Sequence, residues 1–80
     1  MIYRFSNTEI SVSSANTVYD NPIVRLVNPT TGVVNTTIST ASANLYSFSV
    51  LANSEIIIEK LPSHRIQGTG LVASPVAYRY

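Results

Sequence analysis

The chain lacks cysteine and tryptophan and has a single histidine and few charged residues. Without cysteine, neither a disulfide nor a thiolate metal site can hold the fold together. Charged residues make up 11% of the chain and the net charge is +1, whereas roughly a quarter of the residues are charged in ordinary globular proteins. No block of basic residues could neutralise a phosphate backbone, so a nucleic acid is not expected as a partner.

Long apolar runs are also missing. No stretch approaches the roughly 18 apolar residues of a membrane span, and no signal-peptide run follows Met1. The sequence therefore predicts a soluble protein made in the cytoplasm, with no membrane partner. Hydrophobic residues nevertheless supply 45% of the chain, which is too many for a disordered segment.

The length of 80 residues predicts one domain, spanning 1–80. A single core of this size rarely provides more than about 3–5 kcal/mol of stability, so small domains are usually reinforced by disulfides, a metal or association. Cysteine is absent, and one histidine with four scattered carboxylates makes a structural metal improbable. Association remains, and we expect a homo-oligomer or another assembly of many copies.

Residue preferences indicate an all-β fold. Serine, threonine and asparagine supply 26 of the 80 residues, the apolar residues are mostly valine, isoleucine and tyrosine, and no segment holds a helical stripe for three turns. Strands are predicted at 2–5, 9–13, 23–28, 33–40, 45–51 and 55–60, and the segments 71–73 and 76–80 close the chain around Pro75. About seven short strands at spacings near ten residues predict a small antiparallel β-sandwich or barrel.

Three local features add detail to this prediction. Residues 28–32 contain Pro29 and Gly32 and are expected to close a hairpin between the strands on either side. In the strand 45–51, alternation predicts that Tyr46, Phe48 and Val50 point inward. Pro75 is expected to separate the last two strands.

The segment 55–60 has two faces. Ile56 and Ile58 are expected to face the core, whereas Glu55, Ile57 and Glu59 face outward. An outward isoleucine is a candidate contact residue. The two glutamates would lie about 13 Å apart along the strand, too far for a glycosidase pair, and their expected role is to keep a strand edge soluble.

Other residues that carry chemistry in enzymes have simpler interpretations here. His64 has no evident nucleophile, metal or orienting partner, so an exposed loop histidine is expected. Gly68–Thr69–Gly70 precedes a short segment closed by proline, which predicts a plain turn in place of a phosphate loop. The sequence therefore predicts no catalytic residue, no cofactor and no metal, and a protein that is not an enzyme.

The aromatic residues allow two interpretations, a sugar-stacking platform or core and interface anchors. The end of the chain favours the second, because the aromatic and basic run 76–80 suits addition to a neighbour's sheet edge or insertion into a groove. The predicted interface residues are Ile57, Tyr78, Arg79 and Tyr80.

The second half of the chain resembles a known family. The stretches 48–63, 66–68 and 71–78 contain, in order, a strand, a turn before Glu55, an aliphatic strand ending in Glu59–Lys60, a proline loop and a closing Val76–Ala77–Tyr78 strand. In this order they resemble small virion proteins of marine tailed bacteriophages, especially those that infect cyanobacteria. The resemblance covers about residues 45–80 and implies a non-enzymatic structural component of the particle.

The function expected from these observations is that of a capsid decoration or cement protein, made in the host cytoplasm and bound in many copies to the major capsid protein or other virion proteins. Repetition by symmetry would then convert a weak single contact into avidity. Two alternatives remain open. One is a subunit of the tail, neck or a fibre, and the other is a small carbohydrate-binding module that uses exposed tyrosines.

Overall fold

The structure is a computed structural model that describes the backbone of residues 2–79 and the side chains of residues 4–77. All regular structure within this range is β, which confirms the predicted class, and no helix there is long and apolar enough to cross a membrane. The strands are β1 (Ile2–Phe5), β2 (Ile10–Ser11), β3 (Ile23–Asn28), β4 (Val34–Ser39), β5 (Asn44–Val50), β6 (Ser54–Glu59), β7 (Arg65–Gln67) and β8 (Val72–Arg79).

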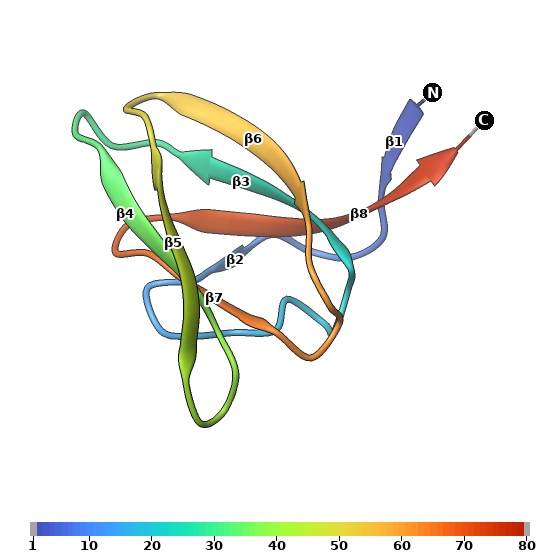
Figure 1. Ribbon diagram of the computed structural model, residues 1–80. Coiled ribbons are helices and arrows are strands. Elements are labelled where there is room, and N and C mark those ends of the chain that lie inside the picture. Colours follow the sequence, from blue (N-terminus) through green and yellow to red (C-terminus); the bar gives the residue numbers. More distant parts are fainter. Residues whose placement is uncertain (1, 80) are drawn as a thin grey trace.

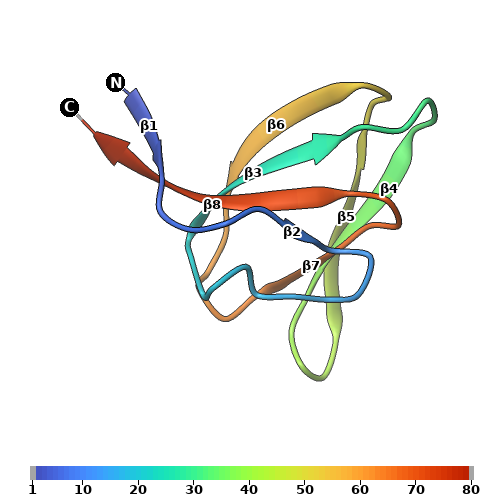
Figure 2. The same cartoon turned by 180° about the vertical axis from the view of Figure 1, so that it is seen from behind.

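The eight strands form two antiparallel sheets (Figure 1). The larger sheet has the order β1-β8-β3-β6, with the short β2 also paired to β8, and the smaller sheet has the order β5-β4-β7. β3 is therefore a central strand, which fits its largely apolar sequence. Figure 2 shows the same arrangement from behind, with both ends of the chain together at the tip of the β1–β8 pair.

The hairpin predicted at residues 28–32 is wrong. β3 pairs with β6 and β8, whereas β4 pairs with β5 and β7, so this turn carries the chain from one sheet to the other. The crossing is held by Asn28, whose fully buried amide donates to the carbonyl oxygens of Gly32 at 2.8 Å and Val50 at 2.9 Å. A turn sequence specifies that the chain reverses, but not which neighbour the next strand pairs with.

The core lies between the two sheets. Both sheets contribute buried aliphatic side chains, and three loop residues, Val12, Val18 and Leu71, complete the cluster. The other members are Val24, Leu26, Val34, Ile38, Val50, Ile66 and Ala73. All buried side-chain nitrogen and oxygen atoms in the described part of the chain have a hydrogen-bond partner, so the core carries no cost from unpaired polar groups.

The alternation of side chains follows the prediction in most strands. In β4, Val34 and Ile38 face the core, and in β6, Ile56 and Ile58 pack against it. In β5 the prediction is wrong at Tyr46, which is 67% exposed. The first part of β5 extends beyond the core, so alternation there does not decide burial.

Pro75 does not interrupt the last strand, contrary to the prediction, because β8 continues through it. Its partner Val24 is at one end of the β3–β8 ladder, and from Val76 onward the strand pairs with β1 through Phe5. A proline lacks a donor, and at the end of a ladder the missing hydrogen bond costs little.

A left-handed turn precedes β3. Val18, Tyr19 and Asp20 all have positive φ angles, of 54°, 60° and 54°. Three consecutive left-handed residues without a glycine are uncommon, because each places its Cβ close to the following carbonyl oxygen. The turn is anchored by the buried Val18, and the backbone nitrogen of Asn21 donates to the Val18 carbonyl oxygen at 3.2 Å.

Candidate functional site

The predicted interface at the end of the chain lies on a two-stranded arm. The backbones of Tyr78 and Arg79 belong to β8 and pair with Tyr3 and Ile2 of β1, while Tyr80 and the side chains of Tyr78 and Arg79 lie outside the described part of the chain. Figures 1 and 2 show the arm extending away from the rest of the fold.

The arm has little support of its own. Among the described strands, β1 pairs with β8 alone, and Phe5 at the base of the arm is 60% exposed. An isolated two-stranded ribbon is marginally stable in water, whereas three or more strands with a covered apolar face are stable. The arm would therefore gain stability from contact with another surface.

Ile57, the fourth predicted interface residue, lies on β6 and is half-buried. It faces outward opposite Arg25 of β3. β3 and β8 both lie between β6 and β1 in the sheet order, so Ile57 is not on a strand next to β1. The predicted residues within the described part of the chain thus lie on two strands, β6 and β8, that do not pair with each other.

Arg25 organises the outer face beside Ile57. Its guanidinium forms an ion pair with Glu55 and lies 4.0 Å from the Glu9 carboxylate. The same group stacks over Phe5, with 5.7 Å from Cζ to the ring centroid, a distance typical of a cation–π contact. Sequence reasoning missed this cluster, because Glu9 is far from Arg25 and Glu55 in the chain and only the sheet register brings the three together.

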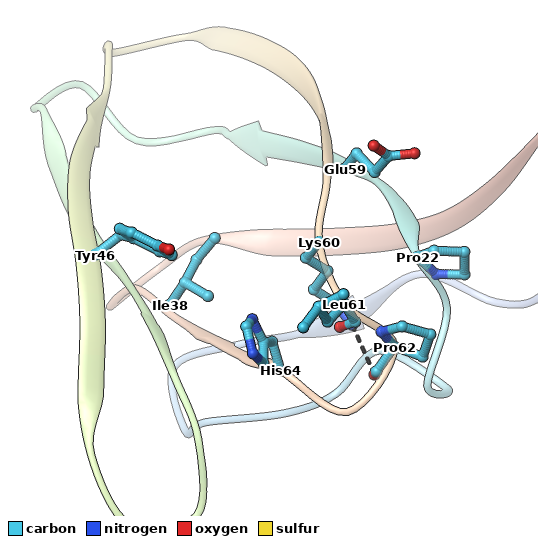
Figure 3. Close-up of a pocket in the computed structure, with 8 residues that line it drawn as sticks. All are labelled: Pro22, Ile38, Tyr46, Glu59, Lys60, Leu61, Pro62 and His64. Atoms are coloured by element: carbon cyan, nitrogen blue, oxygen red, sulfur yellow. Dashed lines mark hydrogen bonds between the residues drawn. The ribbon is translucent and has the colours of Figure 1, made fainter.

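A groove of about 470 Å³ opens between β5 and the loop that joins β6 to β7 (Figure 3). Tyr46 forms one wall, and His64 points into the groove from the loop (Figure 3). The full lining is Pro22, Ile38, Tyr46, Glu59, Lys60, Leu61, Pro62 and His64. Most of the lining is apolar and one wall is an aromatic ring, so the groove is suited to a flat or apolar group.

Lys60 supports the loop beside this groove. The residue is only 7% exposed, and its Nζ donates to the carbonyl oxygens of Leu61 at 3.3 Å and Pro62 at 3.0 Å. Burial lowers the pKa of Lys60 below the ordinary value of 10.5, and the negative charge of Asp20 acts against this shift. The Lys60 ammonium group is therefore occupied by hydrogen bonds to carbonyl oxygens of its own loop.

His64 lies in the same loop and is half-buried, where full exposure was expected. Its backbone nitrogen donates to the Leu61 carbonyl oxygen at 3.0 Å, which closes the turn. Within residues 2–79, no group of three histidine or carboxylate side chains is placed to hold a metal ion. His64 contributes an imidazole to the wall of a groove.

Comparisons of this chain with family models, with curated proteins and with solved structures give no match. The functional argument therefore depends on the arm, the groove and the exposed strand edges.

Proposed function

We propose that this chain is a non-enzymatic structural component of a bacteriophage virion, a decoration protein that binds in many copies to the capsid shell. Its partners in this proposal are the major capsid protein and neighbouring copies of the chain. The protein would be made in the host cytoplasm and act in the particle.

The observation that carries the proposal is the β1–β8 arm. The arm leaves the body of the fold, pairs two strands without a third, and carries the aromatic and basic end of the sequence. Tyrosine and arginine are enriched at the centres of protein interfaces, and added strands are a common mode of attachment. An arm of this kind fits a subunit that is completed by its neighbours.

Copy number in the particle tests the proposal. Particles of a phage whose genome encodes this chain are purified from an infected culture. The amount of the chain in them is then measured by mass spectrometry relative to the major capsid protein. We expect hundreds of copies per particle. A few dozen copies or fewer would favour a tail, neck or fibre subunit, and absence from the particles would refute a virion role.

A second candidate, a small carbohydrate-binding module, is favoured by the exposure of Tyr46 beside the groove. Exposed aromatic rings in sugar-binding proteins stack on the apolar faces of sugar rings, and the His64 imidazole offers a polar partner at the same groove. The test is tyrosine fluorescence during titration with host-surface glycans. A saturable change that is lost in Tyr46→Ala but kept in Tyr19→Ala would support this candidate.

A further inference from the structure

The strand β5 has a free edge that differs from the edges of β1, β6 and β7. β5 is the outer strand of the smaller sheet and is seven residues long. Every second residue of an edge strand directs its N–H and C=O groups away from the sheet, which offers a template for another strand. Proteins usually protect such edges with charges, prolines or a covering segment.

β5 carries none of these protections. Residues 26–54 contain no charged side chain, and the strand itself contains no proline. Its side chains are exposed except at Phe48 and Val50. A shift of register between Ile38 and Ser39 affects only the hairpin end of the β4–β5 ladder, so most of the edge stays regular.

Three other edges, those of β6, β7 and β1, carry such protections. β6 carries the exposed glutamates Glu55 and Glu59, and charged side chains on an edge strand discourage edge-to-edge pairing. β7 has three residues, and Asn16 covers its outer side through hydrogen bonds with Ile66 of 2.8 and 3.1 Å. β1 has four residues and carries the exposed Arg4.

Exposed apolar side chains lie at both ends of the β4–β5 hairpin. Leu45 and Tyr46 on β5 are 41% and 67% exposed. Val33 and Leu51 flank the paired residues Val34 and Val50 at the other end of the hairpin, and are 58% and 65% exposed. These four are the majority of the seven large apolar side chains that are exposed in the described part of the chain, and exposed apolar surface is a common feature of contact sites.

We infer that β5 pairs antiparallel with β5 of a second copy of this chain, so that two three-stranded sheets join into one across a two-fold axis. The inference rests on the proposed function, since it names one contact of the assembled subunit. A second copy is the partner that fits, because a two-fold axis presents the same neutral strand in the antiparallel direction and each N–H meets a C=O. A charged strand would leave its charge without a counter-ion at this edge.

Disulfide trapping tests the contact directly, because the chain has no cysteine of its own. Ser47 is the middle residue of β5 and exposed. Directly opposed residues in an antiparallel pair have Cα atoms about 4.5–5.5 Å apart, within the range that a disulfide spans. Under mild oxidation of the full-length protein, we expect at least one of Leu45→Cys, Ser47→Cys and Ser49→Cys to form a covalent dimer tenfold or more faster than Ser63→Cys. The control Ser63 is also exposed but lies in the β6–β7 loop.

A charge variant separates this contact from the proposed function. Ser47→Lys/Ser49→Lys places four ammonium groups at the junction, and we expect the dimer dissociation constant to increase tenfold or more, with no such change in the control Ser14→Lys/Ser63→Lys. The β5 contact would be overturned if the wild type is oligomeric, Ser47→Lys/Ser49→Lys leaves its dissociation constant unchanged, and all the cysteine variants form covalent dimers at the same rate. That result would leave the proposed function standing. A monomeric wild type that is absent from particles would overturn both.

Discussion

The Asn28 amide nitrogen at the end of β3 donates a 2.9 Å hydrogen bond to the Val50 carbonyl oxygen at the end of β5. This bond joins the two sheets at the point where the chain crosses between them. The amide oxygen of Asn28 also accepts from the Thr30 backbone nitrogen at 3.0 Å and from its hydroxyl at 2.6 Å. One buried side chain thus fixes the crossing turn and ties it to the second sheet.

Asn28→Ala is expected to lower the free energy of unfolding by about 2–4 kcal/mol, because several buried partners lose a hydrogen bond at once. Urea denaturation measures the change. Since this could unfold a small domain entirely, Thr30→Ala provides a milder variant that loses only the hydroxyl contacts and should cost about 1 kcal/mol. Asn35→Ala, on the exposed face of β4, is the control, and an equal effect at Asn28 and Asn35 would contradict this role.

Gly68 is buried beside the side chains of β4. A Cβ there would lie 3.0 Å from Cγ1 of Val34 and 3.2 Å from Oγ1 of Thr36. We expect Gly68→Ala to lower the melting temperature, at a cost of about 1–3 kcal/mol from overpacking. Gly32→Ala is the matched control because its Cβ would meet nothing within 4 Å, and it should be neutral or stabilising. Similar melting temperatures for both variants would argue against this packing.

The left-handed turn at residues 18–20 predicts an unusual response to glycine. Tyr19 has a φ angle of 60° and is 47% exposed, so Tyr19→Gly should raise the free energy of unfolding by about 1 kcal/mol through relief of backbone strain. Tyr46→Gly, at an exposed position in a strand, should lower it by a similar amount. Thermal denaturation compares the two, and destabilisation by both variants would rule out strain at Tyr19.

The lowered pKa of Lys60 predicts a dependence of stability on pH. Burial disfavours the charged amine in the folded state, so the unfolded chain holds the proton more tightly, and the free energy of unfolding rises as the pH increases toward 10.5. In Lys60→Met this contribution should be absent, so the free energy of unfolding, measured by urea denaturation at several pH values, should rise less steeply with pH. Since Lys60 is the only lysine, its titration is also visible by NMR, and Asp20→Asn should lower the Lys60 pKa further. A Lys60 pKa at or above 10.5 would contradict this environment.

The sequence predicts strand positions well because side-chain alternation and β-branched residues act locally. β1 and β3 have the bounds predicted from residue patterns, and Ile56 and Ile58 pack on the core as alternation requires. The pairing of the strands is less accessible, since it depends on contacts between distant segments. The error at residues 28–32 arose in this way, because Asn28 can be recognised as the link to Val50 only once the two sheets are in place.

The sequence and the structure point to different candidate contact surfaces. The terminal run 76–80 was identified from its aromatic and basic side chains, and the structure places the backbone of its residues 76–79 on the β1–β8 arm. The free edge of β5 was missed, because alternation assigned Tyr46 to the core. The uncharged run 26–54 is visible in the sequence, but its meaning depends on knowing that β5 is an outer strand.

The most direct test of the account is the solution mass of the purified chain, measured by sedimentation equilibrium over a wide range of concentrations. The account predicts a mass that increases with concentration to a dimer or a larger assembly. A well-folded monomer of 8.7 kDa at every concentration would contradict it.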